Sequence, residues 1–318
     1  MFKNPENAPY TMIDLFAGIG GTRLGFWQTG KVATVFSSEI NKFSRQTYEA
    51  NFGGEIAGDI TKIDANNIPD HDILVAGFPC QAFSKAGKQL GFEDTRGTLF
   101  FDVARVIRTK RPSAFFLENV KNLTRHDHGK TFKVIMNTLT SLNYDVHYQV
   151  LKASDYGVPQ KRERIYIVGF NKDLIKNSND FHFPQPTNKK TCVGDILDTK
   201  VPAKYTISDR LWAGHQRRKR ENKKRGVGFG YSLVDRDTPA TRTLTARYGK
   251  DGSEILVAQK GKNPRKLTPR EAGRLQGFPD DFIIPVSDTQ AYKQFGNSVC
   301  VPVVNLIAQN IIKVLDGH

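Results

Sequence analysis

The sequence has 318 residues, of which 47 are Lys or Arg and 32 are Asp or Glu, and the resulting net charge of +15 favours a polyanionic partner, above all nucleic acid. Three cysteines at wide, unpatterned spacing indicate neither a disulfide framework nor a zinc site, so we expect no metal. The sequence contains neither a signal-peptide h-region nor a run of about 18 apolar residues. We therefore expect a cytoplasmic protein without a membrane span.

The first predicted element is an apolar strand over Thr11 to Phe16, followed by the glycine turn AGIGG and a helical pattern. Strand, glycine turn and helix form a nucleotide-type unit in which a ligand can approach the backbone at Gly18 and Gly20. The dinucleotide fingerprint G-x-G-x-x-G is not met, because Arg23 stands where its last glycine is required. A tight turn with a purely structural role is the alternative.

Acidic residues follow at the ends of a second predicted strand and of a third short segment. Ala33 to Glu39 forms the second strand, and Glu39 stands where related folds bind ribose hydroxyls with an acid. The short segment Gly58 to Ile60 contains Asp59, which could accept a hydrogen bond from an adenine amine. Each acid alone is more often a helix cap or a solvated group. Together with the glycine turn they indicate a cofactor with an adenosine moiety.

The segment GFPCQAFS, residues 77 to 84, places a lone cysteine after the buried strand Asp72 to Gly77. Pro79 prevents a helix from starting at once, so Cys80 lies at the carboxyl end of a strand, where open α/β sheets bind their ligands. We interpret Cys80 as a nucleophile under a lid formed by residues 87 to 97. A buried cysteine with only a packing role is the alternative.

The strand Ser113 to Val120 follows a helix over Thr98 to Arg111 and is strongly apolar except at Glu118 and Asn119. An acid at the end of a buried strand is unfavourable unless it is paired or protonated. Glu118 is therefore the best proton-donor candidate, with an ion-paired structural glutamate as the alternative.

After a further helix and strand, residues 160 to 170 begin with charges and continue as a strand. Arg162 and Arg164 stand two residues apart at its entry and therefore on one face.

The composition changes after Phe170, where apolar strands become rare. A basic run at 217 to 225 indicates either a solvated helix face or phosphate contacts. Residues 241 to 256 predict two strands joined by a KDG turn, bordered by Arg242 and Arg247. We expect a second domain built for recognition, in which these two arginines contact guanine bases or phosphates.

Residues 265 to 282 predict a helix capped by Thr268 with Pro269 in its first turn, and the chain ends in an amphipathic helix. This helix should pack on the first domain. We therefore predict a catalytic and cofactor-binding domain over 1–185, a recognition domain and hinge over 186–285, and a returning segment over 286–318.

Six motifs in order, DLFAGIGG, GFPCQAFS, FLENV, QKRERIYIVGF, RKLTPREAGRLQGFP and QFGNSV, resemble those of DNA cytosine-C5 methyltransferases of bacterial restriction-modification systems. The resemblance covers nearly the whole chain. It implies an α/β fold with the Rossmann-like mixed sheet of S-adenosyl-L-methionine-dependent methyltransferases and a smaller inserted target-recognition domain. The expected cofactor-binding residues are Phe16, Gly18, Gly20, Glu39, Asp59, Ile60, Pro79, Leu99, Asn297 and Val299.

The resemblance also implies roles in catalysis. Cys80 would add to C6 of a flipped cytosine, Glu118 would protonate N3, Arg164 would hold O2, and Arg162 would activate the thiol or bind phosphate. The family is expected to act on double-stranded DNA as a monomer, paired with a restriction endonuclease. Further DNA contacts are expected from Gln81, Ser84, Lys88 and Arg96.

Three other classes of protein compete with this interpretation. An RNA cytosine methyltransferase of the same fold usually carries PPCQ, whereas this sequence has FPCQ. Arg23 disfavours a nicotinamide oxidoreductase, and the intact Cys80 and Glu118 disfavour a non-catalytic DNA-binding regulator. Within the DNA methyltransferases, the recognition region resembles that of enzymes for sites of the CCGG or CC(N)GG type, which suits a basic protein because arginine bonds guanine bidentately.

Overall fold

The computed structural model describes residues 1–79, 99–187, 189–228 and 230–317. It divides into two compact units. The first comprises Met1–Leu151, Glu163–Gln185 and Val303–His318, and the second comprises Lys152–Arg162 and Pro186–Pro302. The second unit is thus inserted into the first. Its bounds include residues 152–162 and extend to Pro302, whereas the sequence analysis ended the recognition region at 285. The expected domain division remains a prediction, because compactness alone does not define an independently folding domain.

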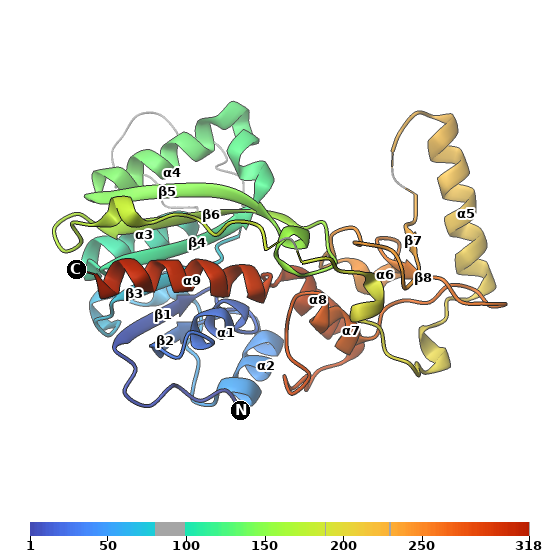
Figure 1. Cartoon of the computed structure of the whole chain (residues 1–318), viewed down its shortest axis with the longest axis horizontal. Helices are drawn as coiled ribbons and strands as arrows, with labels where there is room; N and C mark the ends of the chain where they lie inside the picture. Colours follow the sequence, from blue (N-terminus) through green and yellow to red (C-terminus); the bar gives the residue numbers. More distant parts are fainter. Residues whose placement is uncertain (80–98, 188, 229, 318) are drawn as a thin grey trace. The chain divides into compact units, whose positions relative to one another are not determined.

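A six-stranded sheet forms the centre of the first unit, with the strand order β2-β1-β3-β4-β6-β5 (Figure 1). The first four of these strands are parallel, and β6 runs antiparallel to β4. The expected mixed α/β sheet is therefore confirmed. Its strands are β1 (Tyr10–Leu15), β2 (Val32–Ser38), β3 (Ile73–Ala76), β4 (Ala114–Val120), β5 (Tyr144–Lys152) and β6 (Glu163–Asn171).

Helices pack on both faces of this sheet, because alternate side chains of each strand point to opposite faces. On one face, Leu15, Leu74 and Leu117 share a core with buried residues of α3 (Leu99–Lys110) and α4 (Lys130–Ser141). On the other face, Phe26 of α1 (Gly21–Trp27) meets Phe116 with ring centroids 5.7 Å apart. Glycine turns and strand ends are thereby held on a rigid three-layer support.

The last helix, α9 (Val301–Asp316), packs against α1. A Cβ atom at Gly25 would lie 2.6 Å from the Val304 side chain, so the two helices meet closely, and Asn305 Nδ2 donates to the Gly25 carbonyl at 2.9 Å. The segment Asp288–Asp316 is long and apolar enough by composition to cross a membrane. However, it consists of two helices, and the apolar residues of α9 are buried within the protein, so α9 is a core helix.

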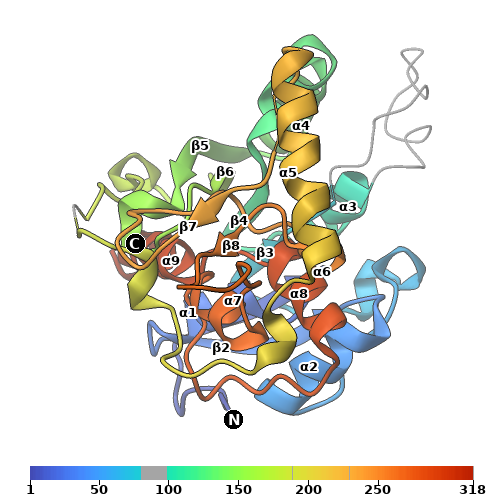
Figure 2. The same ribbon diagram turned by 90° about the vertical axis from the view of Figure 1, so that its right-hand side faces the viewer.

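The second unit contains little sheet. Its strands β7 (Leu233–Val234) and β8 (Leu256–Val257) form one short parallel pair. Its longest helix is α5 (Asp209–Lys224), which carries the basic run and is the long yellow helix in Figure 2. The remaining α-helices of the described structure are α2 (Lys42–Phe52) in the first unit and α6 (Tyr248–Asp251), α7 (Pro269–Arg274) and α8 (Asp288–Asn297) in the second.

The predicted hairpin over 241 to 256 is wrong. Asp251 ends helix α6, and Gly252 follows with φ 69° and donates its N–H to the Tyr248 carbonyl at 3.0 Å. An Asp-Gly pair serves a left-handed helix end as well as a hairpin turn, because both require positive φ at the glycine. β8 instead pairs with β7, which lies some twenty residues earlier in the chain.

The predicted helix start, with Thr268 as the cap and Pro269 in the first turn, is confirmed. Thr268 accepts from the Glu271 amide at 3.1 Å, Glu271 accepts from the Thr268 amide at 2.8 Å, and Pro269 occupies the first turn. Buried Arg265 completes this arrangement with two hydrogen bonds of 2.7 and 2.8 Å to the Glu271 carboxylate. The helix ends at Arg274, well before the expected residue 282, and Gly277 follows at φ 79°.

Candidate active site

The carboxyl ends of four neighbouring strands meet at one edge of the sheet. In the register of the parallel strands, Leu15 pairs with both Ser38 and Ala76, and Ala76 pairs with Leu117. The residues that follow these positions therefore line the same edge. From β1 the chain adds β2 on one side and β3 on the other, so the strand order reverses beside β1. Such a reversal point is the usual ligand site of an open α/β sheet. The residues placed there are Phe16, Glu39, Gly77 and Glu118.

The glycine turn after β1 requires backbone conformations that most residues avoid. Phe16, Gly18 and Gly20 have φ values of 55°, 56° and 83°. A Cβ atom at Gly20 would lie 2.2 Å from the Phe52 ring of α2, whereas a Cβ atom at Gly18 would meet nothing within 4 Å. Gly20 thus allows α1 and α2 to pack, while Gly18 leaves open space beside the turn.

The Glu39 carboxylate is fixed next to this turn by backbone amides. One oxygen accepts from Gly18 N at 2.9 Å and the other from Asn41 N at 2.7 Å. Each carboxylate oxygen has a second lone-pair direction, so Glu39 can still accept from the two hydroxyls of a ribose. A rigid acid beside an open glycine turn is the arrangement that an adenosine-containing cofactor requires.

Asp14, the last but one residue of β1, is a buried acid that the sequence analysis did not single out. Burial raises the pKa of its carboxyl to about 8; Arg23 opposes this shift and Glu39 adds to it. Among the described residues, its buried Oδ2 has no hydrogen-bond partner. The signal in the sequence was an acid inside an otherwise apolar strand.

Asp59 follows a parallel bridge between Ala57 and Ser38 and caps a 3-10 helix, Ile60–Lys62. Its carboxylate accepts from the Thr61 hydroxyl at 2.8 Å and from the Thr61 amide at 3.0 Å. These hydrogen bonds hold the pKa of Asp59 below its usual value. Ile60 is buried in the core of the first unit.

The other expected cofactor residues lie at the ends of elements. Pro79 is exposed at the end of the segment that follows β3, and Leu99 is the first residue of α3. Asn297 ends α8 and is exposed, and Val299 is buried, both in the second unit. Binding of the cofactor by these residues remains a prediction.

Glu118 and Arg164 form an ion pair at the end of β4, which is the alternative that the sequence left open for Glu118, and proton donation by Glu118 remains a prediction. Arg164 Nε lies 3.1 Å from Glu118 Oε1, and the two side chains are only 15% and 11% exposed. They meet because β6 runs antiparallel to β4 and pairs Arg164 with Val120. A Cβ atom at Gly77 would lie 3.8 Å from Glu118 Oε2, so the segment leading to Cys80 passes directly beside this carboxylate.

Asn119 fixes the same segment, a role that the sequence analysis did not assign. Its buried side chain donates from Nδ2 to the Phe78 carbonyl at 2.9 Å and accepts from the Val120 amide at 2.8 Å. The amide therefore connects the end of β4 to the segment after β3, two residues before the candidate nucleophile. Its position directly after Glu118 was the available signal.

The expected residues Cys80, Gln81, Ser84, Lys88 and Arg96 lie outside the described residues. In the part of the chain that the structure describes, no group of His, Cys, Asp or Glu side chains is arranged to hold a metal ion.

Arg162 belongs to the second unit, whereas Arg164 belongs to the first. The Arg162 side chain is 2% exposed, and its guanidinium donates to the carbonyls of Leu244 and Gly296 at 3.2 and 3.3 Å and to that of Ser298. These hydrogen bonds connect three backbone segments of the second unit. In this structure the Arg162 side chain stabilises the packing of these backbone segments. Its role toward the thiol or a phosphate stays a prediction.

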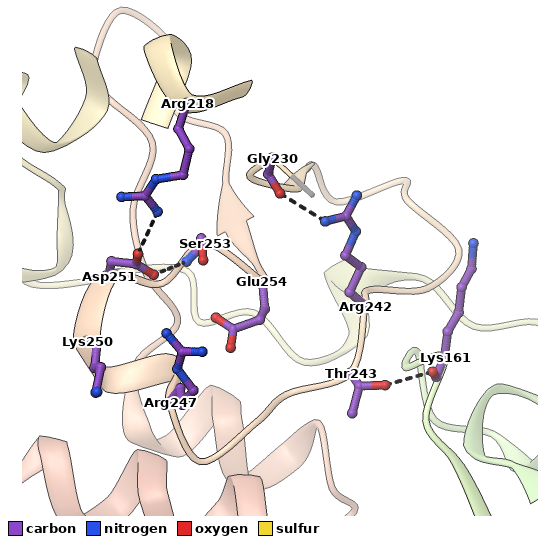
Figure 3. Close-up of a pocket in the computed structure, with 10 residues that line it drawn as sticks. All are labelled: Lys161, Arg218, Gly230, Arg242, Thr243, Arg247, Lys250, Asp251, Ser253 and Glu254. Atoms are coloured by element: carbon purple, nitrogen blue, oxygen red, sulfur yellow. Dashed lines mark hydrogen bonds and ion pairs between the residues drawn. The ribbon is translucent and has the colours of Figure 1, made fainter. Parts of the chain in front are cut away.

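Arg242 and Arg247 line one pocket of about 550 Å³ in the second unit (Figure 3). Both are exposed, and Arg242 Nη1 donates to the Gly230 carbonyl at 3.0 Å. Three further basic side chains and two acids share the pocket, namely Lys161, Arg218, Lys250, Asp251 and Glu254.

The chain matches the model of the family described as C-5 cytosine-specific DNA methylase over residues 10–313. It is 67% identical to the type II methyltransferase M1.ScrFI of Lactococcus lactis subsp. cremoris over 99% of this chain and 81% of that protein. It is 65% identical to the type II methyltransferase M.SsoII of Shigella sonnei over 99% of this chain and 83% of that protein. The solved structure of the Entamoeba histolytica methyltransferase EhMeth has a similar fold, with a TM-score of 0.74 and 22% identity over 96% of this chain and 98% of that chain.

Proposed function

The chain belongs to the C-5 cytosine-specific DNA methylases, and from this premise we propose that it is the modification enzyme of a type II restriction-modification system, with S-adenosyl-L-methionine as its methyl donor. It would act in the cytoplasm as a monomer on double-stranded DNA and protect sites that a partner endonuclease cuts. The observation that supports this most directly is the Glu39 carboxylate, which two backbone amides hold beside the open glycine turn at the same edge of the sheet as the segment that leads to Cys80.

The residues at the sheet edge fit the methyl donor. Glu39 would accept from its ribose hydroxyls, because two backbone amides already hold this carboxylate beside the open space at Gly18. The exposed Pro79 and the start of α3 would border the same ligand. When bound, S-adenosyl-L-methionine supplies an electrophilic methyl group on a sulfonium.

We propose that Cys80 starts the reaction, because cytosine C5 is a poor nucleophile. The Cys80 thiolate forms a bond to C6, and the electron pair of the C5–C6 double bond becomes available at C5 while N3 takes a proton from Glu118. After C5 has been methylated, a base would remove the C5 proton, and the electron pair of that C–H bond would re-form the C5–C6 double bond as the C6–S bond breaks and Cys80 leaves as a thiolate. N3 would return its proton to Glu118. Thiolates suit this role because they both add and leave near neutral pH.

The pairing of Glu118 with Arg164 supports the division of labour between them. N3 and O2 are neighbouring atoms of cytosine, and the acid and the guanidinium are neighbouring groups, 3.1 Å apart. Glu118 would serve N3 while Arg164 donates to O2. Neither the contact of Glu118 with N3 nor that of Arg164 with O2 can form while the cytosine is stacked and paired in the duplex. The target cytosine must therefore be flipped out of the helix.

We propose a target sequence of the CCGG or CC(N)GG type. Two considerations support it: the resemblance of the recognition segments, and the several arginines that line one pocket of the second unit. Arginine bonds O6 and N7 of guanine with two hydrogen bonds in the major groove.

A methyl-transfer assay on duplex DNA and on transfer RNA tests this function. We expect methylation of duplex DNA only, and loss of turnover by at least about 10³-fold in Cys80→Ser, with donor binding kept. Methylation of transfer RNA alone would refute the proposal and identify the protein as an RNA cytosine methyltransferase. Bisulfite sequencing of DNA from cells that express the protein then identifies the site, and methylated sites without CC and GG flanks would refute the proposed target.

A further inference from the structure

The pocket of the second unit contains one arginine of the basic run, Arg218, in an environment different from that of its neighbours. Arg217, Arg218 and Arg220 are all exposed on α5. Arg218 Nη1, however, donates to Asp251 Oδ2 at 3.2 Å, and both side chains line the pocket (Figure 3). Arg217 instead lies 3.8 Å from Glu221 on the same helix. Arg218 therefore differs from its neighbours on α5, because its side chain is oriented by an acid and lines a pocket.

Asp251 is itself held in place. Its other oxygen, Oδ1, accepts from the Ser253 amide at 3.0 Å, and its backbone carbonyl faces His215 Nε2 at 3.0 Å. His215 is buried and belongs to α5, the helix that carries Arg218. The acid and the arginine are thus attached to each other twice, once through their side chains and once through the contact between α5 and the end of α6.

The segment on the opposite side of the pocket is also fixed against α5. The Tyr231 ring contacts Trp212 with centroids 4.7 Å apart, and Lys219 Nζ lies 4.3 Å from its centroid. The Gly230 carbonyl that precedes Tyr231 accepts the hydrogen bond from Arg242. The pocket is therefore formed by packed elements with oriented side chains, as a site that discriminates among bases requires.

The Arg218–Asp251 pair is better suited to a base than to a phosphate. A guanidinium has five N–H donors, so one hydrogen bond to Asp251 leaves an edge free to donate two more. A phosphate approaching that edge would be repelled by the neighbouring carboxylate, whereas a neutral guanine would not. Guanine presents O6 and N7 side by side in the major groove, which matches the fork of an arginine.

Glu254 is fixed in the same pocket without being open to a base. Its Oε1 accepts from the Thr245 hydroxyl at 2.6 Å, and its Oε2 is buried. The groups of the pocket that can reach a base are therefore its exposed basic side chains.

We propose that Arg218 recognises one guanine of the target sequence through O6 and N7, and that Asp251 is the positioning residue that orients its guanidinium. This assignment rests on the proposed function, since it names a specificity residue of the same DNA substrate. It distinguishes Arg218 from the arginines beside it on α5, which are left to contact phosphates.

Selection of duplexes by binding tests this assignment without catalysis. The full-length protein and its variants are incubated with duplexes that carry a randomised segment, and the bound fraction is sequenced. We expect Arg218→Ala and Arg218→Lys to lose preference for one guanine by roughly 5- to 150-fold while other positions keep theirs, since each bidentate pair discriminates on this scale. Arg218→Lys keeps the charge, so a phosphate contact would survive it.

Asp251→Asn distinguishes a positioning role from a merely structural one, because a structural role would not change the preference for a single guanine. It should weaken preference for the same guanine while leaving affinity for unrelated DNA equal or higher, because a negative charge has been removed. Arg217→Ala is the matched control and should weaken all duplexes alike. Uniform weakening or an unchanged profile in both Arg218 variants would overturn the assignment, as would a wild-type protein with no base preference. A failure of the proposed function appears separately, as absence of methyl transfer by the wild-type protein.

Discussion

Glu118 and Arg164 show at the scale of single residues how a carboxylate is accommodated at the end of a buried strand. The ion pair offsets the cost of placing a carboxylate at the end of an apolar strand. Gly77 beside it carries no side chain, and a Cβ atom there would lie 3.8 Å from Glu118 Oε2. The pair therefore stabilises the carboxylate at this position, and its proposed service to a substrate is open to a direct test.

Glu118→Gln should remove the proton donor but keep the shape of the side chain. We expect the single-turnover rate of methyl transfer to fall by about 10²–10⁴-fold, with DNA affinity kept within about tenfold. Glu163→Gln is the matched control, since Glu163 opens the same strand as Arg164 but is half exposed and pairs with Lys121 at 2.8 Å. An unchanged rate in Glu118→Gln would exclude the proton-donor role.

Asp14 predicts a dependence of stability on pH. The folded protein raises the pKa of this carboxyl from 3.8 to about 8 because it is buried, so the folded state holds a proton that the unfolded state releases. The stability contributed by protonated Asp14 is present at low pH and is lost as the pH rises from about 4 to about 8, by at most about 1.4 kcal/mol per pH unit. Asp14→Asn has no such proton. Its stability relative to the wild type, measured by denaturant unfolding, should therefore increase over this range and level off above it; parallel curves would contradict the shift.

At the scale of elements, the two glycines of the turn after β1 have separable roles. Gly18→Ala should cost about 1–2 kcal/mol for the left-handed backbone and weaken donor binding, because the added methyl group enters the open space beside Glu39. Gly20→Ala should destabilise by a further ~1–3 kcal/mol, because its methyl group would overlap the Phe52 ring. Denaturant unfolding and donor titration of both variants test this. Equal losses of stability would show that the contact with Phe52 relaxes freely.

Elements with a strong local signal were predictable from the sequence. The strand before the glycine turn and the cap at Thr268 follow from local hydrogen bonding and apolar pattern, and both formed as expected. The hairpin at residues 241 to 256 failed because an Asp-Gly pair ends a helix as readily as it turns a hairpin. Contacts between distant segments, such as Arg218 with Asp251 and Asn119 with the Phe78 carbonyl, depend on the fold and could not be predicted from local sequence.

At the scale of the whole molecule, the positive charge is unevenly divided. The second unit holds 26 of the 47 lysines and arginines but only 13 of the 32 acidic residues, so its formal charge is +13 against +2 for the first unit. Attraction to the DNA backbone should therefore come chiefly from the second unit. A nearly neutral first unit leaves its site free to select a single base by contact rather than by long-range attraction.

This division of charge predicts which lysines and arginines control the salt dependence of binding to DNA of unrelated sequence. Replacing Arg217 and Arg220 on α5 by alanine should flatten the slope of log affinity against log salt by up to about 2, since each lost phosphate contact removes about 0.9. The matched control replaces Lys172 and Lys176, two exposed lysines of the first unit, and should leave the slope unchanged. Fluorescence anisotropy with a labelled duplex at several salt concentrations measures both. If the two double variants flatten the slope equally, the uneven charge does not direct binding. If neither does, Arg217 and Arg220 contact no phosphate and are solvated.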